Sequence, residues 1–182
     1  MNISLRSRIT QKILNFLFIH KNDSFYISEL SKLINEDRAN TYRQLLKLTE
    51  EGIINSGYQG QQRYFSINNS YRFLNEYKKI INQTFGLDSI LKDKLSSISG
   101  IEKAFIFGSY AKNKLNSDSD LDLLVVGNYD IKKLAKILAE LQKEWRLEIN
   151  PIEYSMKEYN NKIKSKDNFL TSILKNPIIE II

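Results

Sequence analysis

Apolar side chains recur every three or four residues in three segments at the start of the chain, which predicts three helices. The segments are 7–20, 28–34 and 38–51. The last one stops at Gly52, a residue typical of helix C-termini. Two short apolar runs follow at 53–56 and 63–68, and the glycine-containing segment 57–62 between them predicts a hairpin turn.

The second part of the chain changes its hydrophobic period after Gly100. Before that point, residues 71–98 have a helical pattern with a break near Gly86, which predicts a helical connector. After it, apolar runs predict strands at 104–107, 121–126 and 147–154, helices at 131–145 and 157–174, and an apolar tail at 178–182. With a short helix after Gly108, these elements describe a small mixed α/β domain.

The whole chain is therefore expected to be an α+β protein with domains at 1–69 and 99–182 and the connector at 70–98. A hydrophobic share of 42% and a charged share of 26% are ordinary for a soluble globular protein. The absence of cysteine excludes disulfides and zinc-thiolate sites. No apolar run approaches the roughly 18 residues of a membrane span, and the N-terminus lacks the pattern of a secretory signal, so we expect a cytoplasmic protein without a membrane partner.

Charge and helix spacing together suggest a nucleic-acid partner for the first domain. The 27 Lys and Arg residues exceed the 21 Asp and Glu residues, which gives a net charge of +6 and favours polyanions. Residues 27–34 and a second helix starting near Asp37 have the spacing of a helix-turn-helix, and the hairpin that follows supplies a wing. Over roughly 8–68, the order of elements resembles winged helix-turn-helix repressors.

That resemblance implies binding to double-stranded DNA and makes a homodimer on paired half-sites natural. The candidate contacts to base edges and phosphates are Arg38, Asn40, Thr41, Arg43 and Arg63. Glu36 and Asp37 lie next to this surface and argue against it, although Asp37 can serve as a helix N-cap. A winged helix that binds another protein is the alternative.

The second domain contains a Gly108-Ser109 pair after one apolar strand and an Asp120-x-Asp122 pair at the start of the next. The aspartates come twelve and fourteen positions after the glycine. This combination resembles the polymerase-beta-like nucleotidyltransferase superfamily, particularly its minimal branch. The resemblance implies a nucleoside triphosphate substrate, and Mg²⁺ or Mn²⁺ as the cofactor.

The residue types suit that chemistry. Gly108 permits a tight turn, so that Ser109 and nearby amides can hold phosphate oxygens, and Lys112 can add positive charge there. Asp120 and Asp122 are two apart on a strand, so both side chains point to one face, where they can hold a pair of metal ions. A solvated Lys112 and two aspartates that only cap backbone groups are the alternatives.

A catalytic member of the superfamily usually has a third carboxylate on a later strand, acting on the metal and as general base. In the predicted strand 147–154, Glu148 and Asn150 share a face by alternation. An aspartate in many minimal nucleotidyltransferases occupies a place like that of Asn150, so we expect Glu148 to substitute for it. Asp118 continues the same alternation but precedes the strand, where a turn role is expected.

Two functions remain open from the sequence. The first is a metal-dependent enzyme that transfers a nucleoside monophosphate from a nucleoside triphosphate to a hydroxyl group of an unknown acceptor. The second is a DNA-binding regulator whose nucleotidyltransferase domain binds nucleotide or dimerises without turnover. The two functions differ in whether Glu148 supplies the third carboxylate that Asn150 cannot provide.

Overall fold

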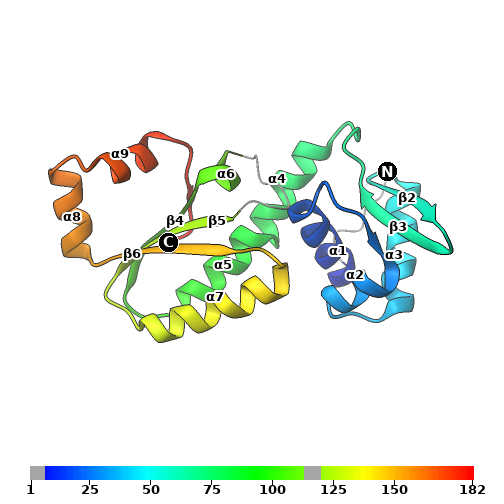
Figure 1. Ribbon diagram of the computed structural model, residues 1–182, viewed down its shortest axis with the longest axis horizontal. Coiled ribbons are helices and arrows are strands. Elements are labelled where there is room, and N and C mark those ends of the chain that lie inside the picture. The colour runs from blue at the N-terminus through cyan, green and yellow to red at the C-terminus, as the bar shows by residue number, and fades with distance from the viewer. Residues whose placement is uncertain (1–6, 113–119) are drawn as a thin grey trace. The chain divides into compact units, whose positions relative to one another are not determined.

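The computed structural model describes residues 7–112 and 120–182, which form two compact units joined between Leu87 and Asp88 (Figure 1). None of the described helices is long and apolar enough to cross a membrane. The N-terminal unit contains α1 (Arg8–Ile19), β1 (Phe25–Tyr26), α2 (Ile27–Leu33), α3 (Arg38–Glu50), β2 (Ile54–Gln59), β3 (Gln62–Ile67) and α4 (Leu74–Thr84). Its three strands form an antiparallel sheet in the order β1-β3-β2. This is a winged helix-turn-helix, as the sequence predicts.

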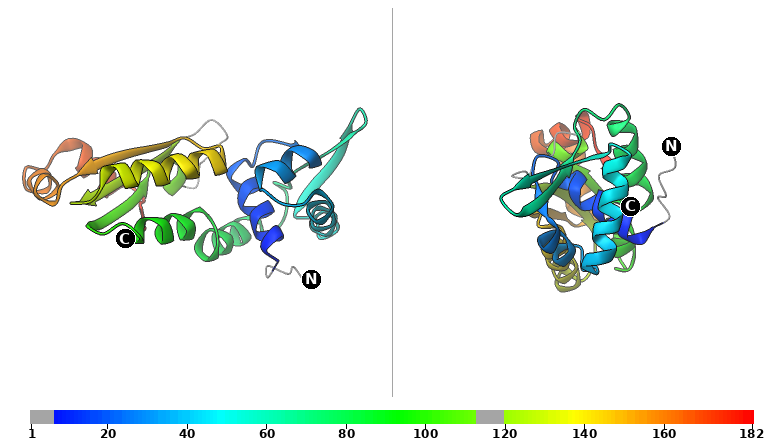
Figure 2. Two further views of the ribbon diagram at one scale, coloured as in Figure 1. Left: turned by 90° about the horizontal axis from the view of Figure 1, so that it is seen from below. Right: turned by 90° about the vertical axis from the view of Figure 1, so that its right-hand side faces the viewer.

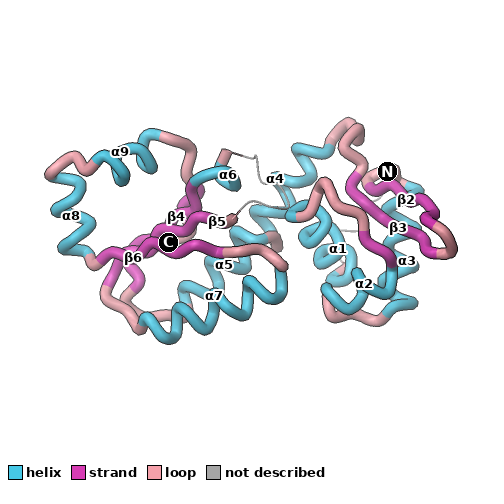
Figure 3. The backbone as a smooth tube through the Cα atoms, viewed as in Figure 1, coloured by secondary structure: helices cyan, strands magenta, loops and turns pink. Residues whose placement is uncertain are grey.

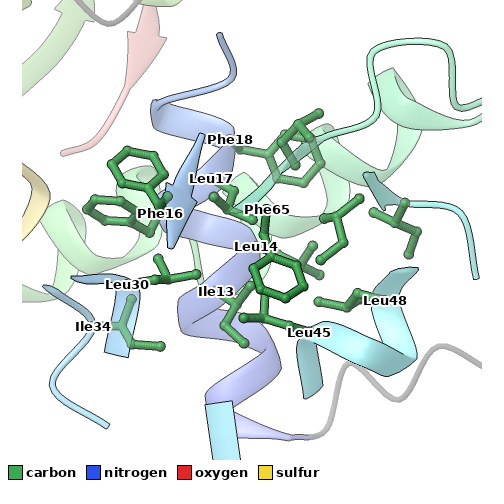
Figure 4. Packing of buried hydrophobic residues seen from close by; sticks show 14 of the residues in the cluster. Ile13, Leu14, Phe16, Leu17, Phe18, Leu30, Ile34, Leu45, Leu48 and Phe65 are labelled. Carbon is green, nitrogen blue, oxygen red and sulfur yellow. The ribbon is translucent and has the colours of Figure 1, made fainter. Parts of the chain in front are cut away.

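The core of the N-terminal unit forms around α1, whose apolar side chains are largely hidden from solvent (Figure 4). Ile13, Leu14 and Leu17 are fully buried against residues from α2, α3 and the hairpin. Ile81 of α4 is buried in the same cluster, so this helix belongs to the N-terminal core. The helical spacing of apolar residues in the sequence thus corresponds to the face of α1 that packs in the core.

The wing differs from the sequence expectation because its turn is shorter. β2 runs through Gly57 to Gln59, which pairs directly with Gln62. Only Gly60 and Gln61 form the loop, and Gly60 has a φ of +61°, which two-residue hairpin loops require. The predicted six-residue turn was wrong because Gly57 lies within a strand, where its neighbours continue the pairing.

The C-terminal unit is a four-stranded sheet in the order β6-β5-β4-β7. Its strands are β4 (Ile101–Phe107), β5 (Leu121–Gly127), β6 (Ile149–Tyr154) and β7 (Ile179–Glu180), and its helices are α5 (Leu87–Ser96), α6 (Gly108–Ala111), α7 (Ile131–Trp145), α8 (Met156–Lys164) and α9 (Asn168–Lys175). β5 and β6 are parallel, whereas β4 is antiparallel to both β5 and β7. Helices α5 and α7 lie along one face, and α8 and α9 pack on part of the other (Figures 1 and 2).

The C-terminal segment departs from prediction in two respects. The single helix expected at 157–174 is two helices, separated by a break at 165–167 (Figure 3). Lys166 has a φ of +53° there, and the Asp167 carboxylate accepts a hydrogen bond from the Leu170 amide, so that a new helix begins. The expected apolar tail contributes β7, which pairs with the C-terminal half of β4.

Candidate functional site

One row of side chains crosses three strands of the C-terminal sheet at the end where β4 meets α6. Phe107 of β4 is the register partner of Asp122 of β5, and Asp122 is the partner of Asn150 of β6. Alternation along β5 places Asp122 on the same face as Leu124 and Val126, which pack beneath α8 and α9. The row lies beyond that packed cluster, on the same face of the sheet.

The second aspartate joins this row through a hydrogen bond. Asp120 directly precedes β5 and is exposed, and its Oδ2 accepts a hydrogen bond of 2.9 Å from Nδ2 of Asn150. Asp120, Asp122 and Asn150 therefore come together, as their alternate positions on two parallel strands require. Asp118 lies outside the described residues.

Gly108 lies against the carboxylate of Asp122 and has a φ of +73°. A Cβ at this position would approach Oδ2 of Asp122 to 2.0 Å and its carboxyl carbon to 3.1 Å. Both the left-handed backbone and the close approach disfavour any side chain at this position, since a Cβ would strain the backbone and displace the Asp122 carboxylate. Ser109 follows within α6, and Lys112, which caps that helix, is exposed to solvent.

The two carboxylates create an electrostatic conflict. Burial raises the pKa of Asp122, and the neighbouring charge of Asp120 raises it further. A divalent cation between the two groups would relieve both effects, because carboxylate oxygens are the ligands that Mg²⁺ and Mn²⁺ prefer. The donor set therefore suits such an ion.

A partly buried hydrogen bond fixes the helix that follows Gly108. The Tyr110 hydroxyl donates to Oδ1 of Asp88 at 2.6 Å, and burial, followed by the Asp88 charge, raises the pKa of Tyr110 well above its usual range. Asp88 lies in the first turn of α5, 22 positions earlier in the chain. The sequence reasoning missed this pair, because no local pattern links two residues so far apart.

Glu148 is exposed and precedes β6 by one residue. Its backbone carbonyl accepts a hydrogen bond of 2.8 Å from the Leu121 amide, which aligns the start of β5 with β6. Within 7–112 and 120–182, no three Asp, Glu or His side chains come close enough together to hold a metal ion. The side chain that hydrogen-bonds to Asp120 is that of Asn150, and a role for Glu148 stays a prediction.

A family model described as "Nucleotidyltransferase domain" matches residues 88–179, half of the chain. The chain belongs to this family. The match begins at the residue that holds Tyr110 and includes the whole row of site residues. The nucleotidyltransferase part of the sequence resemblance is therefore confirmed.

A Methanocaldococcus jannaschii protein named "Putative protein adenylyltransferase" is 35% identical to this chain over 63 residues. The alignment covers 35% of this chain and 63% of that protein, so the chain spans less than two thirds of this relative.

The solved structures that resemble the chain include MepR, a transcription regulator of the Staphylococcus aureus multidrug efflux pump MepA. It has 14% identity and a TM-score of 0.37 over 51% of this chain and 66% of its own. A complex of S. aureus MepR with DNA has 16% identity and a TM-score of 0.37 over 50% of this chain and 76% of its own. The winged helix is identified from the order of its own helices and strands.

Among the residues predicted to contact DNA, the expectation for Thr41 was wrong. Thr41 is fully buried, and its hydroxyl donates to the Asp37 carbonyl at 2.8 Å, because this position of α3 faces the core. Arg38 and Arg43 are exposed on the same helix, and Arg43 donates to the side chain of Asn40. The two arginines are therefore accessible to a ligand.

Arg63 is half-buried at the junction of the wing and α3. Its guanidinium donates to Oγ of Ser56 at 2.7 and 3.2 Å and to the hydroxyl of Tyr42 at 3.3 Å, and it lies over the ring of Phe65. These contacts hold the wing against the helix. Arg63 is consequently a structural residue of this surface, whatever else it contacts.

The acidic residues next to this surface are already engaged. Glu36 forms a 2.7 Å ion pair with Lys12, and the Asp37 carboxylate caps α3 by accepting a hydrogen bond from the Asn40 amide at 2.9 Å. The N-cap role foreseen for Asp37 is confirmed. A groove of about 600 Å³ runs between the start of α3 and the wing, and its lining includes Tyr26, Arg38, Tyr42, Tyr58, Gln62 and Arg63.

Proposed function

We propose that the C-terminal unit of this nucleotidyltransferase-family protein transfers a nucleoside monophosphate from a nucleoside triphosphate to an acceptor hydroxyl, with Mg²⁺ or Mn²⁺. The observation that carries the proposal is the contact between Gly108 and the carboxylate of Asp122, with Asp120 beside it. A backbone kept free of side-chain bulk and two carboxylates on one face form a site for a metal-bound triphosphate. The name of the archaeal relative favours a protein hydroxyl as the acceptor.

In the proposed reaction, the acceptor oxygen forms a bond to the α-phosphorus. The bond from that phosphorus to the bridging oxygen breaks, and its electron pair leaves with pyrophosphate. The hydroxyl proton passes to a carboxylate, for which Glu148 is our candidate, since it shares a face with Asn150 by alternation. Asn150 itself is a neutral amide and cannot take up the proton.

Asp120 and Asp122 would hold the metal, which when bound polarises the α-phosphate and stabilises the leaving pyrophosphate. Asn150 donates to Asp120 and so orients that carboxylate. Ser109 and Lys112 follow the glycine turn, and in the proposal they bind phosphate oxygens.

The proposal is tested by incubating the purified protein with α-phosphate-labelled nucleoside triphosphates, Mg²⁺ or Mn²⁺ and an extract of the source cells. Transfer of label to a macromolecule, including the protein itself, is expected. It should fall at least about a hundredfold in Asp120→Asn and Asp122→Asn, because neither amide can hold the metal as a carboxylate does. Glu102→Gln, an exposed acid at the far end of β4, is the matched control. Equal labelling by wild type and both aspartate variants would exclude the activity.

We also propose that the winged helix binds double-stranded DNA through the exposed arginines of α3. Arg38 and Arg43 lie on the helix that this class of domain inserts into the major groove. Replacing both with alanine should weaken duplex binding and lower the slope of log affinity against log salt by about 0.9 for each phosphate that the protein no longer neutralises. Lys47→Ala, an exposed cation nearer the other end of α3, serves as the control. Unchanged affinity and slope would leave a protein-binding role for this surface.

A regulator without turnover is the second candidate, and Asn150 is the observation that favours it. This amide contacts Asp120 where the resemblance calls for a third carboxylate. If the site lacks only that group, Asn150→Asp should create or increase label transfer. The regulator function is supported instead if a bound nucleotide changes the affinity for DNA and neither wild type nor Asn150→Asp transfers label.

A further inference from the structure

An aromatic pair adjoins the carboxylates on the open part of the sheet face. Phe107 is half-buried and lies directly across from Asp122 in the strand register. Phe169, near the start of α9, contacts it edge to face, with ring centroids 6.4 Å apart and an angle of 85° between the rings. Figure 1 shows α9 on the same side of the sheet as α6.

Phe169 remains 46% exposed despite this contact. The rest of α9 behaves as an ordinary amphipathic helix, because Leu170 and Ile173 are buried. A large aromatic ring left half in water costs hydrophobic free energy, which a ligand stacked on it would recover. The ring is also held in place by Phe107, so little side-chain freedom would be lost on binding.

From this geometry we propose that Phe169, supported by Phe107, is the platform on which the nucleobase of the triphosphate stacks. The inference rests on the proposed function, because the carboxylates of Asp120 and Asp122 fix where the metal-bound phosphates lie. Phe107 is the register partner of Asp122 on the neighbouring strand, so the ring pair adjoins the proposed metal site. A base has a flat apolar face that an aromatic ring accepts without regard to its hydrogen-bonding edge.

The platform has a consequence for specificity. Stacking alone discriminates weakly among bases, since every base presents a π-face. We expect only a modest preference, in which adenine and guanine triphosphates bind more tightly than pyrimidine ones, because the larger purine rings overlap more of the phenyl ring. Inorganic tripolyphosphate, which has no base, should bind through the metal site alone.

The experiment measures binding of two probes to the full chain with Mg²⁺ by calorimetry. One is α,β-methylene-ATP, which cannot transfer its nucleotide, and the other is inorganic tripolyphosphate. Phe169→Ala should weaken binding of the ATP analogue about tenfold and leave tripolyphosphate unchanged. Phe169→Tyr should restore the affinity, because it keeps the ring. Ile163→Ala, an apolar side chain of α8 that is 43% exposed, is the matched control and should change neither affinity.

The two probes separate the possible failures. If neither binds to wild type, the proposed nucleotide site fails together with this inference. If both bind and Phe169→Ala leaves the ATP analogue unaffected, the site stands and the platform is refuted. Weakened acceptor modification with unchanged affinity for the ATP analogue would assign Phe169 to the acceptor instead, and would equally overturn the proposal.

Discussion

Replacing Gly108 with alanine tests the link between backbone geometry and chemistry most directly. Two costs arise from the structure. A φ of +73° puts an alanine in the left-handed region, at about 1–2 kcal/mol, and the new methyl group would lie 2.0 Å from Oδ2 of Asp122. The carboxylate must rotate away, which removes it from the position proposed for metal binding.

The lower conformational entropy of alanine in the unfolded chain returns about 0.4–1 kcal/mol. The backbone alone is therefore expected to contribute a net loss of stability of about 1 kcal/mol, or roughly 2–4 °C in Tm for a chain of this length. The loss of activity should be far larger, about a hundredfold or more in label transfer, because a displaced Asp122 could no longer share the proposed cation with Asp120. Thermal unfolding and the labelling assay measure the two effects separately.

Gly52→Ala is the matched control for this change. Gly52 has a φ of +76°, close to that of Gly108, but nothing lies within 4 Å of the Cβ it would acquire. It should lose a similar amount of stability and no transfer activity. Wild-type activity in Gly108→Ala, or an equal loss of activity in both variants, would show that the contact with Asp122 is irrelevant to function.

Three further predictions concern stability. Tyr110→Phe removes the partly buried hydrogen bond to Asp88 and should lower the free energy of unfolding by about 1–3 kcal/mol at neutral pH. Because the pKa of Tyr110 is raised in the folded state, only the unfolded state releases this proton near pH 10, so the wild-type protein should lose stability above that pH. In thermal melts across pH 8–11, the difference in Tm between wild type and Tyr110→Phe should therefore shrink. A difference in Tm that stays constant over this range would contradict the prediction. Lys166→Gly should raise the unfolding free energy by up to about 1 kcal/mol, since glycine accepts the φ of +53°; lower stability in denaturant titrations would refute this. Asp122→Asn should stabilise the metal-free protein by up to about 1 kcal/mol because it removes a partly buried charge and, secondarily, its repulsion from Asp120. Mg²⁺ should cancel this advantage in thermal melts, and no gain in stability without metal would contradict the prediction.

The local elements of this protein follow from its sequence. The helical period of apolar residues found α1, α3 and α7 within a residue or two of their observed ends, because each buries one continuous face. Asp120-x-Asp122 after Gly108-Ser109 predicted residues that the structure brings together, since alternation on a strand fixes which side chains share a face. Thr41 was the exception: its polar side chain predicted a surface position, but it lies on the buried face of α3, where its hydroxyl donates to the Asp37 carbonyl of the same chain segment.

Contacts between distant segments were decided only by the tertiary structure. Phe25 and Tyr26 form β1 only because β3 lies beside them, and Ile179 pairs with β4 at a separation that no local pattern reveals. The same holds for the hydrogen bond from Tyr110 to Asp88 and for the ring contact of Phe107 with Phe169. The sequence by itself indicated an N-terminal winged helix, a mixed α/β part after it and the paired aspartates, through local periodicity and spacing, whereas the boundary between the two units at Leu87 and Asp88 came from the tertiary structure. The tertiary structure decided that Asn150, rather than Glu148, contacts Asp120, because strand register is set by pairing across the sheet.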